Sequence, residues 1–328
     1  MMQQDTGKLT ELTEQALSLV ESGNLPAAKG IYEQICQANK NDAGAWMMLG
    51  AINGELENFA EAVSCLQQAV ALQPDYAEAH FSLGNVQRMQ GNLPAALESF
   101  RRAAEIRQDY AEAWIMMGGI SGLLGMFDKA ETYCRQAVVL QPDSVDAHMN
   151  LANALQHLDK PEEAASHYQT VIELQPGLAV AWFMLGKVHM QSGSLAEAET
   201  CYRQTVALQP GFAEAHLALG DTLQAQSKPE EAIATYRETL RHKPDFVEGH
   251  NRLGMLLHSL KRFDEAQESY RAALRLKPDQ AVIHFNLGVV LQEQGAHEDA
   301  EIGYRHAIKI KPNYARAHAN LGYVLRLQ

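Results

Sequence analysis

The sequence predicts an all-α solenoid, an array of antiparallel helix pairs with a fixed period of 34. Three observations predict it: prolines that recur at this period, a small residue fixed in each first helix, and an alanine fixed in each second helix. Self-similarity at a fixed period of this length is typical of repeat arrays. The 328-residue length alone suggests about two domains, but the period favours one repetitive array.

The prolines define the frame of the repeat. They recur at Pro74, Pro142, Pro176, Pro210, Pro244, Pro278 and Pro312, and Gln108 occupies the one slot between Pro74 and Pro312 that lacks proline. Proline is expected to end the second helix of each pair because it has no N–H to continue the ladder. With this proline as repeat position 32, the chain divides into an N-terminal tail (1–8), a divergent first repeat (9–42), eight regular repeats (43–314) and a terminal single helix, or half repeat (315–328).

Two apolar faces recur in each repeat. Positions 4, 7, 8 and 11 have helical spacing, and positions 20, 24 and 27 repeat that spacing on a second helix. Position 8 is always Gly or Ala and position 20 is always Ala, so we expect the two helices to approach closely. Position 24 is large in every repeat except at Cys134, and its side chain should fill the space beside that contact. A turn is expected near position 15.

Composition excludes several classes of function. The formal net charge of -13 disfavours general nucleic-acid binding, which needs a basic surface. No apolar run is long enough to span a membrane, and residues 1–8 lack the apolar core of a secretory signal, so a cytoplasmic location is expected. The four cysteines form no Cys-x-x-Cys pair, which favours reduced, buried thiols over a redox or zinc site.

The repeat motif resembles tetratricopeptide-repeat (TPR) arrays of bacterial proteins, and His284–Gly288 and His318–Gly322 resemble the superhelix that precedes the catalytic domain of O-GlcNAc transferases. The resemblance covers residues 43–328 throughout and 9–42 in part, because Gln15 and Lys40 depart from the motif. It implies a right-handed superhelix in which the first helix of each pair lines a concave groove for peptides or partner proteins.

No set of residues in the sequence has the spacing expected of a catalytic site once the repeat frame is taken into account. Six histidines occupy position 4, where other repeats carry tryptophan, and each of them lies in a separate repeat. A His-Glu-x-x-His pair is absent. We therefore expect packing histidines, no metal, no cofactor and no enzymatic activity.

The groove that the TPR resemblance implies would be apolar, rich in methionine and more polar towards the C-terminus. Its predicted partner-contacting residues are Met47, Met48, Phe81, Ile115, Met116, Gly119, Gly122, Met149, Asn150, Phe183, Met184, Asn286 and Asn320. Methionine-rich surfaces accommodate varied apolar ligands. The alternative is that these side chains pack between neighbouring first helices and expose little.

Gly119 and Gly122 lie inside a predicted helix, where each glycine costs roughly 1 kcal/mol relative to alanine. Either the neighbouring repeats hold the helix despite this cost, or a ligand approaches the backbone closely.

Basic residues also recur on the last three second helices, from Arg237 to Lys311. They form either a solvated face or a stripe that docks an acidic partner.

The predicted function is a non-enzymatic scaffold that binds an apolar or amphipathic peptide segment in the concave groove. Two alternatives stay open. The chain could be the substrate-recognition arm of a larger enzyme such as a glycosyltransferase, or it could self-assemble through the array ends. The C-terminal helix carries Leu321, Tyr323, Val324, Leu325 and Leu327, so its apolar face is a candidate surface for self-association.

Overall fold

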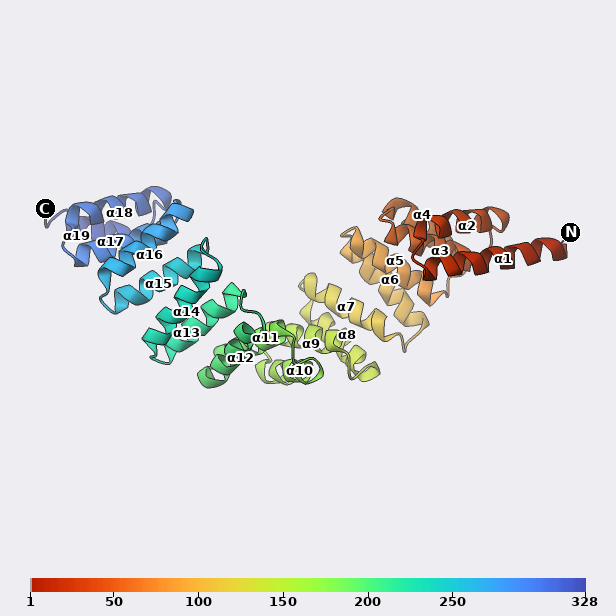
Figure 1. The fold of residues 1–328 in the computed structure, drawn as a ribbon, viewed down its shortest axis with the longest axis horizontal. Coiled ribbons are helices and arrows are strands. Elements are labelled where there is room, and N and C mark those ends of the chain that lie inside the picture. Colours follow the sequence, from red (N-terminus) through yellow and green to blue (C-terminus); the bar gives the residue numbers. More distant parts are fainter. Residues whose placement is uncertain (1) are drawn as a thin grey trace. The chain divides into compact units, whose positions relative to one another are not determined.

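The computed structural model describes residues 2–328, with side chains from residue 9 onward, and every regular element in that range is an α-helix (Figure 1). The helices form two compact units, one ending at Leu174 and the other running from Gln175 to Gln328. The boundary falls at the end of a second helix, so it respects the predicted repeat frame. Among the described residues, no helix is both long enough and apolar enough to cross a membrane.

The first unit consists of helix pairs in which each first helix packs against the second helix that follows it, and that second helix packs against the next first helix. Helix α1 begins at Met2, inside the segment expected to be an N-terminal tail. The helices of this unit are α1 (Met2–Glu21), α2 (Leu25–Ala38), α3 (Ala43–Glu55), α4 (Phe59–Leu72), α5 (Ala77–Met89), α6 (Leu93–Ile106), α7 (Ala111–Leu123), α8 (Phe127–Leu140), α9 (Val145–His157) and α10 (Pro161–Leu174).

The second unit repeats the same pairing and ends on a single helix. Its helices are α11 (Ala179–Gln191), α12 (Leu195–Leu208), α13 (Ala213–Ala225), α14 (Pro229–His242), α15 (Val247–Ser259), α16 (Phe263–Leu276), α17 (Ala281–Glu293), α18 (His297–Ile310) and α19 (Ala315–Val324). The predicted all-α array of paired helices is confirmed in both units, with its period unchanged.

The same left-handed turn joins the two helices of each pair. Repeat position 15 has a positive φ in every pair, between 57° and 78°. Glycine occupies this position in five turns, and Glu57, Asp159, Ser227 and Lys261 occupy it in the other four. The left-handed residue lets the backbone close over the last turn of the first helix, as where the N–H of Asn92 donates to the carbonyl of Gln87 at 2.9 Å.

The close contact inside each pair is between the small residue at position 8 and the side chain at position 24. A Cβ atom added to Gly220 would lie 2.3 Å from Cε1 of Tyr236. The Tyr236 ring is fully buried, and its hydroxyl donates to Oδ1 of Asp221 at 2.5 Å. The ring is therefore held at both ends, and it has little freedom to make room for a larger neighbour.

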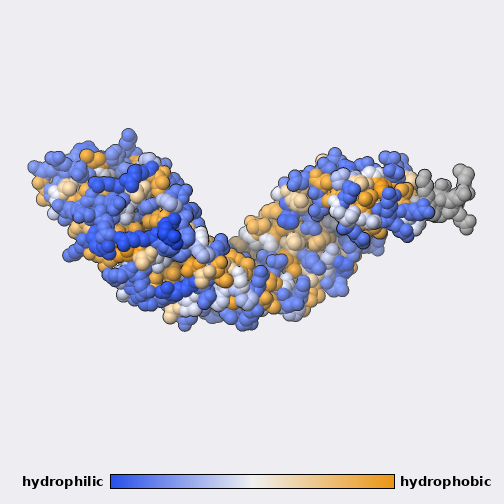
Figure 2. Space-filling model, in the orientation of Figure 1, coloured by the Kyte–Doolittle hydropathy of each residue, from blue (hydrophilic) through white to orange (hydrophobic). Residues whose placement is uncertain are grey.

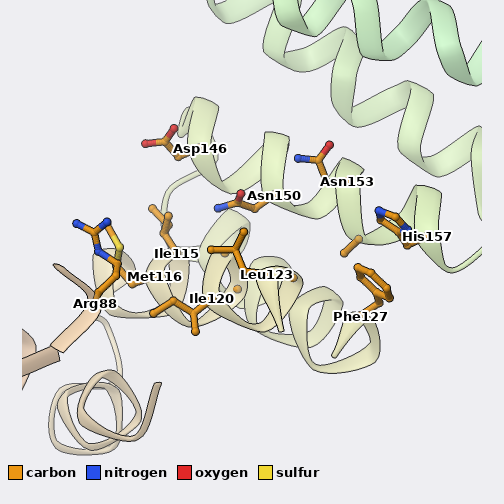
Figure 3. A pocket seen from close by; sticks show the side chains of 14 residues that line it. Arg88, Ile115, Met116, Ile120, Leu123, Phe127, Asp146, Asn150, Asn153 and His157 are labelled. Carbon is orange, nitrogen blue, oxygen red and sulfur yellow. The ribbon is translucent and has the colours of Figure 1, made fainter. Parts of the chain in front are cut away.

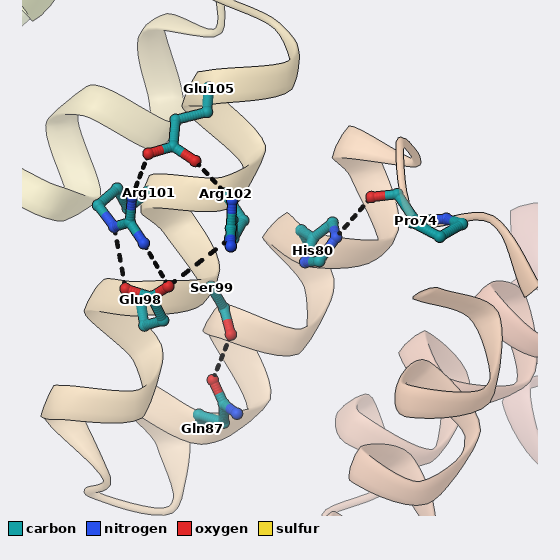
Figure 4. Close-up of polar contacts among 8 residues, drawn as sticks. All are labelled: Pro74, His80, Gln87, Glu98, Ser99, Arg101, Arg102 and Glu105. Atoms are coloured by element: carbon teal, nitrogen blue, oxygen red, sulfur yellow. Dashed lines mark hydrogen bonds and ion pairs between the residues drawn. The ribbon is translucent and has the colours of Figure 1, made fainter. Parts of the chain in front are cut away.

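Position 4 carries a ring N–H that joins consecutive repeats. In six repeats a histidine Nε2 lies 2.7–3.1 Å from the carbonyl oxygen of the proline six residues earlier, as for His80 and Pro74 in Figure 4. In the other three, the tryptophan Nε1 donates to the equivalent carbonyl at 3.0–3.1 Å. Either histidine or tryptophan can occupy this position, because each ring has an N–H group that reaches the same carbonyl oxygen.

The four cysteines are buried and free. Burial raises the pKa of Cys36 and of Cys134 to about 12 and that of Cys201 to about 11. A thiol with so high a pKa is protonated near neutral pH and is a poor nucleophile. These side chains therefore act as small apolar groups in the core.

We predict that Gly220→Ala destabilises the protein by about 1–3 kcal/mol, because the added methyl group would overlap the immobilised Tyr236 ring. Gly211→Ala is the matched control, since nothing lies within 4 Å of its added Cβ. Urea unfolding measures both free energies. Equal stability of the two variants would contradict the prediction.

We also predict that His80→Phe costs about 1 kcal/mol of unfolding free energy, because the carbonyl of Pro74 loses its donor. His80→Trp should retain most of the stability, since Trp46, Trp114 and Trp182 make the same bond in other repeats. Thermal and urea unfolding of the two variants test this. The prediction is wrong if the phenylalanine variant is as stable as the tryptophan variant.

Candidate functional site

A pocket of about 430 Å3 lies over helix α7 in the first unit (Figure 3). Helix α7 supplies one side of it, helix α9 supplies another, and α5 and α8 contribute one residue each. Its volume is within the range of about 300–1,000 Å3 that is usual for ligand pockets. The lining residues are Arg88, Ile115, Met116, Gly118, Gly119, Ile120, Gly122, Leu123, Phe127, Asp146, Asn150, Asn153, Ala154 and His157.

Helix α7 gives the pocket its apolar character. Glu112 is its one charged residue, whereas the exposed face of a helix usually carries several. Leu123, at the edge of the pocket, is 75% exposed, and Ile115 and Met116 are half-buried. Figure 2 shows apolar residues gathered over this part of the first unit. An exposed apolar patch of this kind is typical of a binding surface.

The glycines of α7 differ in their surroundings. A Cβ on Gly118 would meet Sγ of Cys134, so Gly118 serves the contact with α8. A Cβ on Gly119 would lie 3.2 Å from Nδ2 of Asn150, so Gly119 lets α9 approach. A Cβ on Gly122 would meet nothing within 4 Å. Neighbouring helices therefore explain the first two glycines, and Gly122 alone opens space that nothing in the first unit fills.

Polar side chains of α9 form the wall opposite this apolar surface. Tyr168 donates its hydroxyl to Oδ1 of Asn153 at 2.6 Å, and burial raises the pKa of Tyr168, so the hydroxyl keeps its proton. This bond fixes the Asn153 amide and leaves its NH2 group as a donor. At the far end, the rings of Phe127 and His157 stack with centroids 4.2 Å apart.

Two opposite charges border the other end. Arg88 comes from α5 and Asp146 from α9, the first helices before and after α7, and Figure 3 shows both side chains at the end of the pocket that holds Ile115 and Met116. Among the ion pairs and hydrogen bonds of the described side chains, neither Arg88 nor Asp146 takes part in one. Glu78, at the start of α5, instead pairs with Arg107 at 2.6 Å.

Five of the predicted groove residues line the pocket: Ile115, Met116, Gly119, Gly122 and Asn150. The four others of the first unit lie outside it. Met47 and Met48 pack against two apolar clusters, and Met149 is half-buried. Phe81 stacks on Tyr110 at 4.8 Å and meets the edge of Phe100 at 5.2 Å, so its ring serves the packing within its own repeat.

The remaining predicted residues belong to the second unit. Phe183 contacts the rings of Tyr202 and Phe212, Met184 and Asn286 are half-buried, and Asn320 donates to the hydroxyl of Tyr304 at 3.2 Å. Acidic groups on these first helices have basic partners: Glu214 pairs with Lys243 at 3.6 Å, and Glu248 with Arg252 at 2.8 Å.

Sequence reasoning did not assign the pocket residues that surround the five it found. Phe127 belongs to a second helix, and Arg88, Asn153 and His157 come from the neighbouring first helices. The repeat frame could have identified two of these residues. Arg88 occupies the same repeat position, 12, as Gly122, and His157 occupies the same position, 13, as Leu123. Chain position indicates which face these residues share, but not that they enclose a cavity.

The basic stripe and the C-terminal helix are two other surfaces that the sequence indicates. In the stripe, Arg237 pairs with Glu265 at 2.6 Å and Arg241 with Glu238 at 2.5 Å. At the C-terminal helix, Tyr323 is 47% exposed, and Gly322 has nothing within 4 Å of an added Cβ. Within the described residues, no three His, Cys, Asp or Glu side chains group as a metal ion would require.

The chain belongs to the tetratricopeptide-repeat family. One family model, described as tetratricopeptide repeat, matches residues 54–111, 183–245, 217–281 and 252–315, which together exceed half of the chain. Two further tetratricopeptide-repeat models match residues 145–178 and 111–144. Proteins of this family mediate protein–protein interactions, and this chain is a repeat protein of that protein-binding class. No curated protein matches it in sequence.

Several solved structures are similar in fold. PilF of Pseudomonas aeruginosa is 18% identical, with 66% of this chain and 99% of that chain covered and a TM-score of 0.55. A tetratricopeptide repeat protein from Parabacteroides merdae is 16% identical, with 76% and 98% covered and a TM-score of 0.53. A MamA protein is 22% identical, with 52% and 94% covered and a TM-score of 0.50. Identities this low show the fold alone.

We predict that Gly122→Ala stabilises the protein by about 0.5–1 kcal/mol, because alanine favours a helix interior and the added methyl group meets no neighbour. Gly119→Ala should gain less, since its Cβ would press on Asn150 at 3.2 Å. Urea unfolding of the two variants gives the comparison. Loss of stability in Gly122→Ala would show that glycine is needed there for packing.

Proposed function

We propose that this chain is a protein-interaction scaffold that binds an apolar or amphipathic peptide segment on the first helices of its first unit, with the α7 pocket as the main contact. One observation carries the proposal: a concave, apolar pocket lies on the row of first helices that the family uses for its partners. Gly122 adds support, because it lowers helix stability where no neighbouring side chain requires a glycine.

The lining suits a peptide. Ile115, Met116 and Leu123 offer apolar surface to a side chain, and burial of one large aliphatic side chain contributes about 1.5–3 kcal/mol. Asn150 and Asn153 offer amide groups to a peptide backbone, which must satisfy its own N–H and C=O groups when water is displaced. Binding energy in such interfaces concentrates in a few buried anchors.

The experiment is a selection of random twelve-residue peptides displayed on phage against the purified chain, followed by calorimetry on synthetic copies. Gly122→Phe should weaken the selected peptides by tenfold or more, equivalent to about 1.4 kcal/mol, because the ring occupies the open space above Gly122. Ala225→Phe is the matched control. It adds the same ring at an exposed position of a first helix in the second unit.

Enriched peptides that bind the parent and Ala225→Phe equally, and Gly122→Phe poorly, would support the pocket as the binding site. Affinity that is unchanged in Gly122→Phe would overturn it, as would a selection that enriches no peptide. Circular dichroism of each variant checks that its helices are intact.

A further inference from the structure

We propose that the α7 pocket is selective for a peptide in which one large aliphatic residue stands between a basic and an acidic residue. The basic side chain pairs with Asp146 on α9, and the acidic side chain pairs with Arg88 on α5. This inference rests on the proposed function, and it specifies the chemistry of the peptide.

Several charges on the first helices are paired within the chain. Glu78 is paired with Arg107, Glu214 with Lys243 and Glu248 with Arg252. Arg88 and Asp146 both line the cavity, and neither takes part in an ion pair or hydrogen bond among the described side chains. Two opposite charges at one pocket that do not pair with each other offer complementary contacts to a ligand that carries both signs.

The arrangement fixes where the ligand charges must lie. Arg88 lies on α5 and Asp146 on α9, the first helices before and after α7, which carries Ile115 and Met116 (Figure 3). The two charges therefore approach the apolar surface of α7 from different neighbouring helices, and a large aliphatic side chain seated on Ile115 and Met116 can place one neighbour towards α5 and the other towards α9.

The pocket is too apolar for a ligand recognised by charge alone. Nine of its fourteen lining residues are glycine, alanine, aliphatic, methionine or phenylalanine. Transfer of the aliphatic side chain from water into the pocket supplies most of the affinity. Exposed ion pairs are weak, so the two charges add little affinity and act mainly on selectivity. Charge complementarity acts mainly by rejecting partners that place a like charge at either wall.

The experiment uses a synthetic peptide library with a central leucine and all residues varied on both sides, tested on the full chain by fluorescence anisotropy. Peptides with Lys or Arg on one side and Asp or Glu on the other should bind best. Replacing the basic residue by alanine should weaken binding about threefold to fivefold, and replacing it by glutamate about tenfold. Affinity should fall as salt screens the pairs.

Charge exchange gives the sharpest test. Asp146→Lys should bind the parent peptide poorly and should recover affinity for the peptide whose basic residue is replaced by glutamate. Arg88→Glu should show the same behaviour with the peptide whose acidic residue is replaced by lysine. Lys129→Glu is a control that reverses a charge at an exposed position of α8 outside the pocket lining, and it should leave both peptides unaffected.

The outcomes separate the two proposals. If peptides bind, lose affinity in Gly122→Phe and show no preference for flanking charge, the charge selectivity is overturned and the proposed function stands. If charged peptides bind equally well to Gly122→Phe, the pocket is not the site and both proposals fail. If Asp146→Lys recovers no affinity for the exchanged peptide while its circular dichroism and unfolding midpoint match the parent, the assignment of the basic residue to Asp146 is overturned.

Discussion

The close contact between a small residue and a buried ring, made in most of the helix pairs, sets the helix spacing on which the rest of the structure depends. Gly220 and Tyr236 show it most tightly, since a Cβ on the glycine would lie 2.3 Å from the ring. Because the ring is fixed by burial and by its bond to Asp221, the spacing of the two helices is fixed as well. Each first helix is then held in a constant place relative to its repeat, and the residues it exposes form an ordered row.

The third regular repeat departs from this rule at the place where the pocket forms. Cys134 replaces the large residue, and helix α7 carries three glycines, Gly118, Gly119 and Gly122. Packing against Cys134 and Asn150 explains the first two of these glycines, but not the third. Gly122 lowers the intrinsic stability of α7 and leaves open space beside the apolar side chains of the pocket.

Polar contacts hold the framework without contributing much binding chemistry. Ring N–H groups at position 4 satisfy the carbonyls where consecutive repeats meet. On the second helices, exposed pairs such as Arg135 with Glu163 at 2.5 Å link neighbouring repeats, and on α6 Arg101 and Arg102 lie between Glu98 and Glu105 (Figure 4). Exposed pairs of this kind contribute about 0–1 kcal/mol each. Arg88 and Asp146 at the pocket are not part of this network of pairs.

The sequence by itself determined the helix pairs, their period and the residues at each contact, because these depend on spacing along the chain and on side-chain size. It also indicated that Ile115, Met116 and Gly122 share the face of one helix. Only the tertiary structure decided that Phe81 is held between Tyr110 and Phe100 while Leu123 stays exposed. It also distinguished Gly119, which lies under Asn150, from Gly122, which has no neighbour. The exposure of a side chain depends on which residues of the adjacent helices cover it. A periodic sequence pattern shows which side chains lie on the same face of a helix, but it does not show what covers that face.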